Sequence, residues 1–220
     1  MPVESMKSKR ERARQLAAAF TDTYPDAHCE LDYEDAFQLL VATILSAQCT
    51  DKRVNMVTPT LFERFPQPDR MAGAGRAEIE QLVQSTGFFR SKARSIQEAS
   101  ADLVTKHGGQ VPASMEDLIA LRGVGRKTAN VVLGNAFDIN VGVVVDTHVA
   151  RLSKRLGLTT KTDPVKIEQD LMKLVPQPNW ALWSHWLIFH GRRRCPARKP
   201  DCEGCEVATL CPKRGVTKKK

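Results

Sequence analysis

Two glycines separated by one residue, Gly123 and Gly125, constrain the fold of this chain more than any other feature of its sequence. They lie between two segments, 114–121 and 126–137, whose apolar residues recur at helical spacing. Glycine at such a bend accepts a positive φ and lets another molecule approach the backbone closely. The sequence therefore predicts a helix-hairpin-helix over about 114–137 that offers backbone N–H groups to a phosphate.

A lysine and an aspartate follow this bend. Lys127 lies in the first turn of the second helix, where the positive helix end disfavours an ammonium ion; an uncharged lysine amine is a nucleophile. Asp146 comes nineteen residues later, in Val145-Asp-Thr-His148, and either caps the next helix or assists the lysine. Hairpin, lysine and aspartate together indicate covalent chemistry on DNA, although Lys127 alone could equally bind a phosphate.

The remaining apolar pattern predicts an all-α fold. The segment 39–45 is apolar nearly all round, so we expect a fully buried helix there. Residues 141–145 could pass for a strand, but they have no evident partner and are interpreted as an extended linker. We expect helices near 5–23, 34–47, 51–64, 76–85, 89–107, 114–121, 126–137, 147–156, 164–174 and 179–192.

Positive charge is concentrated at one end of the chain. Residues 190–220 hold ten basic and three acidic side chains, a net +7 of the total +8. A focused basic region favours a polyanion such as nucleic acid as the partner. The sequence has no apolar run of about 18 residues, and residues 1–19 lack the apolar core of a secretory signal. We therefore expect a cytoplasmic protein that does not bind membranes.

Four of the six cysteines form a C-x6-C-x2-C-x5-C pattern, in which four thiolates can surround one metal centre. Disulfides are disfavoured because nothing marks the chain as secreted. Structural zinc usually takes two close cysteine pairs, and only one is present, so the spacing favours an iron–sulfur cluster but leaves zinc open. We interpret the isolated Cys29 and Cys49 as buried small residues. The four clustered cysteines are Cys195, Cys202, Cys205 and Cys211.

The succession L-x-G-V-G-x-K-T-A, V-D-T-H and C-x6-C-x2-C-x5-C, between about Glu34 and Cys211, resembles the endonuclease III family of helix-hairpin-helix DNA glycosylases. The resemblance implies a bifunctional glycosylase and abasic-site lyase that removes oxidised pyrimidines, of the thymine-glycol type, from double-stranded DNA. It implies two helical domains with a DNA-binding cleft between them. One is a six-helix domain, residues 29–140, and the other, residues 1–28 plus 141–220, carries the cluster. We expect a monomeric, bacterial-type protein associated with the nucleoid.

The resemblance also implies roles for individual residues. Lys127 would be the nucleophile that forms a Schiff base, Asp146 its acidic partner, and the four cysteines the ligands of a [4Fe-4S] cluster. Carbonyls of the hairpin would hold a cation. DNA contacts are implied for Gln48, which would fill the gap left by the flipped base, for Phe88 as a wedge, and for Gly123, Gly125, His148, Arg198 and Lys199. Buried packing for Phe88 and a structural role for His148 stay open.

Two residues depart from the family pattern. Arg122 stands where proline is usual and adds a candidate phosphate contact. Phe88 stands where leucine is frequent, and its larger ring can stack. Two other functions also remain: a related glycosylase for a different damaged or mismatched base, and a DNA-binding iron–sulfur redox module without catalysis. The presence of both Lys127 and Asp146 argues against the redox module.

Overall fold

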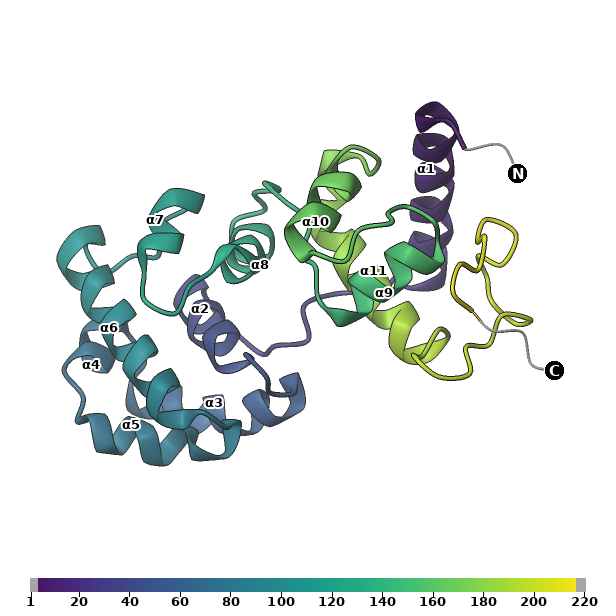
Figure 1. Cartoon of the computed structure of the whole chain (residues 1–220). Coiled ribbons are helices and arrows are strands. Elements are labelled where there is room, and N and C mark those ends of the chain that lie inside the picture. The colour runs from purple at the N-terminus through teal and green to yellow at the C-terminus, as the bar shows by residue number, and fades with distance from the viewer. Residues whose placement is uncertain (1–3, 217–220) are drawn as a thin grey trace. The chain divides into compact units, whose positions relative to one another are not determined.

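The computed structural model describes residues 4–216, and within that range it contains helices and turns but no strand (Figure 1). The predicted all-α fold is confirmed. The terminal lysines Lys218–Lys220, counted above in the basic region, lie outside the described residues. The chain divides into two compact units: unit 1 comprises Met1–His28 and Asn140–Lys220, and unit 2 comprises Cys29–Ile139.

Unit 2 is built around α2, whose side chains from Leu39 to Leu45 are all buried, as its uninterrupted apolar sequence predicts. Helices α3, α6 and α8 pack against it, while α4 and α5 pack against α6 (Figure 1). The helices of this unit are α2 (Ala36–Leu45), α3 (Asp51–Arg64), α4 (Pro68–Ala72), α5 (Arg76–Val83), the 3-10 turn η1 (Gln84–Thr86), α6 (Phe89–His107), α7 (Met115–Ala120) and α8 (Arg126–Ala136).

Unit 1 has its core where α11 packs against α1 and α9. Phe20 and Trp183 are fully buried there, with ring centroids 6.1 Å apart in an edge-on arrangement. Cysteines of the C-terminal loop pack against the same core. The helices of this unit are α1 (Met6–Thr23), α9 (Thr147–Arg155), α10 (Pro164–Met172), the 3-10 turn η2 (Gln177–Asn179) and α11 (Trp180–Arg193).

Helix starts follow the capping residues in the sequence. Ser114, Asp146 and Asp163 each occupy an N-cap and accept a backbone N–H from three residues further on.

The expected helix 34–47 is shorter, because residues after Leu45 form a turn. Helix α4 was not predicted, since five residues are too few to show a helical period. Residues 141–145 form no strand: 141 and 142 are a bend, and 143–145 have no regular secondary structure. No described helix combines the length and apolar character needed to cross a bilayer.

Candidate active site and cluster loop

The hairpin between α7 and α8 is a tight turn. The Val124 N–H donates to the carbonyl oxygen of Leu121 at 3.2 Å, and the Val124 side chain is buried. Gly123 has φ +78°, and a Cβ there would lie 2.7 Å from the Cβ of Ser95, so both its conformation and its surroundings require glycine. Gly125 differs: it has φ −97°, and a Cβ would meet nothing within 4 Å.

Lys127 is the second residue of α8 and its side chain is exposed. The N-cap of α8 is Gly125, which has no side chain to cap the first helical N–H groups. The turn therefore presents uncapped backbone donors beside an exposed lysine. This combination suits a phosphate-bearing ligand that must reach the lysine amine.

Asp146 is the N-cap of α9, with one carboxylate oxygen, Oδ1, accepting the Val149 N–H at 2.7 Å. The structural interpretation of this aspartate is thus confirmed. A carboxylate has a second oxygen, so capping by Oδ1 is compatible with a chemical role for Oδ2. Lys127 belongs to unit 2 and Asp146 to unit 1.

His148 lies in the first turn of α9, half-buried beside α11. The Arg151 guanidinium donates to its Nδ1 at 3.2 Å, and a Cβ at Gly191 would lie 2.5 Å from the same nitrogen. Arginine is only a donor, so Nδ1 accepts and the neutral ring carries its proton on Nε2. Glycine at position 191 is what leaves room for this ring against α11.

Gln48 and Phe88 share an unusual backbone. Both have left-handed conformations, with φ +53° and +48°, although neither is glycine. Gln48 is exposed in the turn after α2, and Phe88 is the residue before α6. The Phe88 side chain is 68% exposed, which rules out the alternative that it packs in the core.

Arg122 is exposed in the hairpin but engaged in an ion pair. Its Nε lies 3.3 Å from a carboxylate oxygen of Glu98 on α6, and Arg94 binds the other oxygen at 2.7 Å. These arginines lower the pKa of Glu98, with the hydrogen bond from Arg94 the largest cause. A phosphate bound by Arg122 would compete with this carboxylate.

The four clustered cysteines are free thiols that line one small pocket, about 20 Å³ in volume. Burial raises the pKa of Cys205 to about 11, so a positive metal centre is what would hold this sulfur as a thiolate at neutral pH. Apolar side chains of Leu152, Leu156 and Ala208 form part of the wall. Four thiols converging on an apolar pocket fit a metal–sulfur cluster, because soft thiolates are its ligands.

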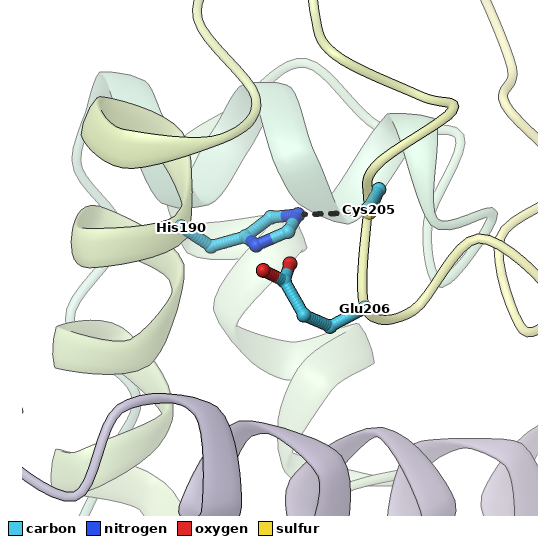
Figure 2. A group of neighbouring side chains, drawn as sticks. All are labelled: His190, Cys205 and Glu206. Carbon is cyan, nitrogen blue, oxygen red and sulfur yellow. Dashed lines mark hydrogen bonds between the residues drawn. The ribbon is translucent and has the colours of Figure 1, made fainter.

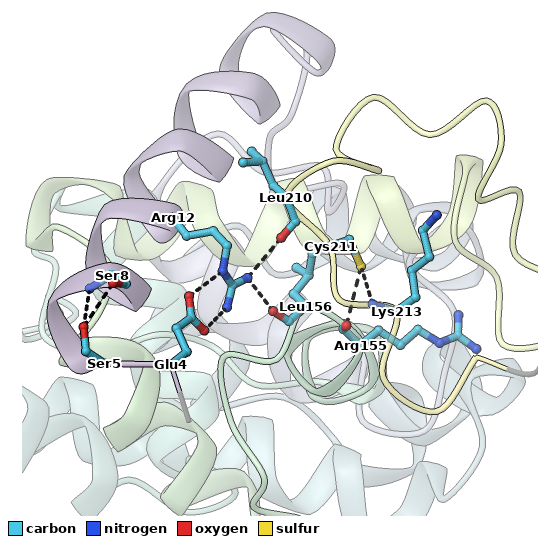
Figure 3. Close-up of polar contacts among 9 residues, drawn as sticks. All are labelled: Glu4, Ser5, Ser8, Arg12, Arg155, Leu156, Leu210, Cys211 and Lys213. Carbon is cyan, nitrogen blue, oxygen red and sulfur yellow. Dashed lines mark hydrogen bonds and ion pairs between the residues drawn. The ribbon is translucent and has the colours of Figure 1, made fainter. Parts of the chain in front are cut away.

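Donors directed at the sulfur atoms support the same conclusion. Arg155 donates from Nη1 to Cys195 Sγ at 3.1 Å. The Lys213 N–H donates to Cys211 Sγ at 3.4 Å (Figure 3). Hydrogen bonds of this kind stabilise metal-bound thiolates. Arg155 was not singled out in the sequence, where it reads only as one more basic residue on a helix.

Arg12, which is paired with Glu4, ties the C-terminal loop that carries the cysteines to α1. Arg12 donates to the carbonyl oxygens of Leu156 and Leu210 at 2.6 and 3.2 Å, and it binds both carboxylate oxygens of Glu4 (Figure 3). The hydrogen bond from Arg12 lowers the pKa of Glu4. This side chain thus joins the first helix, the end of α9 and the C-terminal loop.

His190, Cys205 and Glu206 also place ligand atoms within 4.8 Å of one another (Figure 2). The histidine already bonds Tyr24 through Nδ1 at 2.8 Å and approaches Cys205 Sγ through Nε2 at 3.6 Å. Glu206 is bound by Arg194 at 2.7 Å. Burial lowers the pKa of His190 to about 4, so the ring is neutral. His190 is thus engaged by Tyr24 and Cys205, and Glu206 by Arg194, so the three residues are not a separate metal site.

Arg198 and Lys199 are exposed in the loop between Cys195 and Cys202. Arg155 fixes the start of this loop by donating to the carbonyl oxygens of Pro196 and Ala197 at 2.7 and 2.8 Å. This anchoring holds the base of the loop, while its two basic side chains reach solvent.

The expectation for the two isolated cysteines was partly wrong, because Cys29 and Cys49 are half-buried. Both lie in non-helical segments of unit 2, where solvent reaches part of each side chain. Burial still raises the pKa of Cys29 to about 11, so this thiol stays protonated at neutral pH.

Comparison with known proteins defines the class. Residues 41–177 match the family described as HhH-GPD superfamily base excision DNA repair protein, and the chain belongs to that superfamily. A thermostable thymine-DNA glycosylase shares the fold, with a TM-score of 0.84 at 19% identity, over 94% of this chain and 98% of the other.

Within the superfamily the chain belongs to the endonuclease III family. Endonuclease III of Synechocystis sp. is 57% identical over 210 residues, covering 96% of each chain. The enzyme of Bacillus subtilis is 44% identical and covers 86% of this chain and 87% of its own. A trapped endonuclease III–DNA covalent intermediate superposes with a TM-score of 0.86 at 42% identity, covering 93% of this chain and 96% of the other.

Proposed function

We propose that this protein excises oxidised pyrimidines from double-stranded DNA and cuts the strand at the resulting abasic site, using Lys127 as nucleophile. Membership of the endonuclease III family makes it a base excision repair DNA glycosylase with abasic-site lyase activity. The observation that carries the proposal is the exposed Lys127 in the uncapped first turn of α8, directly after the Gly-Val-Gly bend. The preference for thymine-glycol-type lesions rests on the family resemblance.

The reaction follows from the chemistry of an amine. The Lys127 nitrogen attacks C1′ of the sugar, and the base departs with the electrons of the glycosidic bond and takes up a proton. The attached nitrogen loses a proton, and its lone pair then opens the C1′–O4′ bond, with O4′ taking up a proton, to give a protonated Schiff base. The iminium acidifies the C2′ proton; loss of that proton expels the 3′ phosphate by β-elimination. Asp146 is the carboxylate that assists proton transfer and stabilises the positive charge that develops on the sugar.

DNA has to be held and opened before that attack. Backbone donors at Gly123 and Gly125 bind a phosphate, with a cation held by hairpin carbonyls and Arg122 as an added contact. The lesion base is extruded, Gln48 occupies the vacated space opposite the orphaned base, and Phe88 wedges between neighbouring bases. His148 contacts the DNA backbone near the site.

Cys195, Cys202, Cys205 and Cys211 would hold a [4Fe-4S] cluster, which supplies four metal–thiolate bonds that cross-link the C-terminal loop. That loop carries Arg198 and Lys199, and its fixed shape directs them at phosphates. Unit 2 serves as the hairpin domain and unit 1 as the cluster domain. The protein works as a monomer in the bacterial cytoplasm, on the nucleoid.

The experiment is borohydride trapping on duplex DNA that contains thymine glycol. Borohydride reduces the Schiff base to a stable amine, so wild-type protein should form a covalent adduct and Lys127→Gln should form none. The matched control is Lys166→Gln, which changes another exposed lysine in the first turn of a helix, α10. Adduct formation by Lys127→Gln would contradict the assignment. Adducts on a different lesion alone would favour the rival glycosylase, and their complete absence would favour the redox module.

A further inference from the structure

Lys92 on α6 is a buried lysine that the reaction does not use. The residue is 5% exposed. The ammonium Nζ donates to two main-chain carbonyl oxygens, those of Leu45 at 2.8 Å and Thr86 at 2.7 Å. Burying an ammonium ion is costly unless its donors are satisfied, so this arrangement demands an explanation.

The two carbonyls belong to different turns. Leu45 is the last residue of α2, three positions before Gln48. Thr86 is the last residue of η1, two positions before Phe88. The backbone of Lys92 adds a third link, because its N–H donates to the Phe88 carbonyl oxygen at 3.0 Å. One residue of α6 thus holds the turn of Gln48 and the turn of Phe88 together.

Both turns need such a restraint. Gln48 and Phe88 are non-glycine residues in left-handed conformations, which are strained and persist only where the surroundings determine them. Thr86 is itself buried, and its hydroxyl donates to the Val83 carbonyl oxygen at 2.8 Å. The base of the Phe88 turn is therefore rigid, whereas its tip is exposed.

We propose that Lys92 is a positioning residue that sets the spacing between the Gln48 turn and the Phe88 turn, so that both side chains enter the duplex as one preorganised unit. The inference rests on the proposed function, in which Gln48 fills the gap and Phe88 wedges. Preorganisation matters because a turn ordered only after it meets DNA would lose conformational entropy at that step. Lys92 touches neither the lesion nor the reacting sugar in this scheme.

The alternative is that Lys92 only stabilises unit 2 by satisfying buried carbonyls. The two roles differ in their dependence on substrate. A single-stranded abasic site has no base to extrude and no opposite base to replace, so trapping on it requires Lys127 but not insertion. Duplex DNA with thymine glycol requires both. A purely structural lysine would affect the two substrates equally.

The test compares Lys92→Met with wild type on these two substrates, with Lys106→Met as a control on the same helix, where an exposed lysine pairs with Asp102. We expect Lys92→Met to lower the single-turnover excision rate on duplex roughly ten-fold or more, the effect typical of losing hydrogen bonds to a charged group. Borohydride trapping on the single-stranded site should stay within about two-fold of wild type.

A double-mutant cycle sharpens the result. In a Gln48→Ala/Phe88→Ala background, adding Lys92→Met should cause no further loss on duplex, because the residues it positions are gone. Equal loss on both substrates, a full extra loss in that background, or no loss on duplex would each overturn the inference. If Lys92→Met does not fold, Lys92→Gln takes its place, since its amide can still donate to one carbonyl. Failure of wild type to trap either substrate would instead refute the proposed function.

Discussion

Gly123 and Ser95 lie so close that a Cβ on the glycine would sit 2.7 Å from the serine Cβ and 2.8 Å from its hydroxyl oxygen. Ser95 is buried on α6, so it cannot swing aside freely. The hairpin therefore packs against α6 through a contact that only glycine permits, and this contact fixes the position of the turn that we propose binds DNA.

The first prediction follows from this contact. Gly123→Ala should destabilise the protein by about 1–3 kcal/mol, since it combines overpacking with a left-handed alanine. It should also weaken duplex binding, because the turn must shift. Gly125→Ala is the matched control, with open space at its Cβ and a negative φ, and it should leave stability within about 0.5 kcal/mol of wild type. Urea unfolding measures the change in stability, and a binding assay measures the change in duplex affinity. Equal destabilisation by Gly123→Ala and Gly125→Ala would contradict this prediction.

Asp146 caps α9 and has a proposed chemical role. Substitution by asparagine tests the two roles separately. The side-chain amide oxygen in Asp146→Asn can still accept the Val149 N–H, so this variant should keep stability within about 0.5 kcal/mol while most turnover is lost. Asp146→Ala should lose the cap as well, costing about 1 kcal/mol. The control is Asp163→Asn, which changes the N-cap of α10 and should preserve turnover. Thermal unfolding and single-turnover rates distinguish these outcomes; an active Asp146→Asn would remove the carboxylate from the mechanism.

Arg155 is predicted to protect the proposed iron–sulfur cluster. Its Nη1 bonds Cys195 Sγ, and its guanidinium holds the carbonyls of Pro196 and Ala197. Arg155→Met should therefore lower the iron content per chain and hasten cluster loss in air. We also expect a drop of about 1–3 kcal/mol in unfolding free energy from the orphaned carbonyls. Lys154→Met, a half-buried neighbour on the same helix, should retain full iron. Iron assay and the brown cluster absorbance provide the measurement, and normal iron in Arg155→Met would refute the role.

Glu98 is predicted to restrain DNA affinity by pairing with Arg122. Glu98→Gln frees this arginine, so duplex affinity should rise at low salt, and the slope of log affinity against log salt should steepen by about one charge. Glu78→Gln, which breaks the exposed pair with Arg64 in the same unit, is the control. Because its neighbours depress the Glu98 pKa, the carboxylate stays charged at neutral pH. The pairing should be lost only as pH falls through that lowered pKa, so the wild-type and variant affinities should converge there.

The sequence by itself determined most of the helices, the cap at Asp146 and the two chemical motifs, but not the five-residue helix α4. These features depend on residues a few positions apart in the chain, so a single sequence displays them. They include a turn of helix, a Ser or Asp cap and a Gly-Val-Gly bend. The four cysteines were equally visible, because their ligand spacing is short. The family resemblance then supplied roles for residues such as Gln48 and Phe88, whose types alone are uninformative.

Only the tertiary structure decided the contacts between distant segments. Lys92 meets carbonyls 47 and 6 residues away, and Arg155 meets Cys195 40 residues away. In the sequence both are ordinary basic residues on helices, since burial and partner choice depend on how helices pack rather than on local pattern. The sequence pattern also could not tell whether the Phe88 ring is buried or is an exposed wedge. Nor could it show that Arg122 pairs with Glu98, because Glu98 comes from another helix.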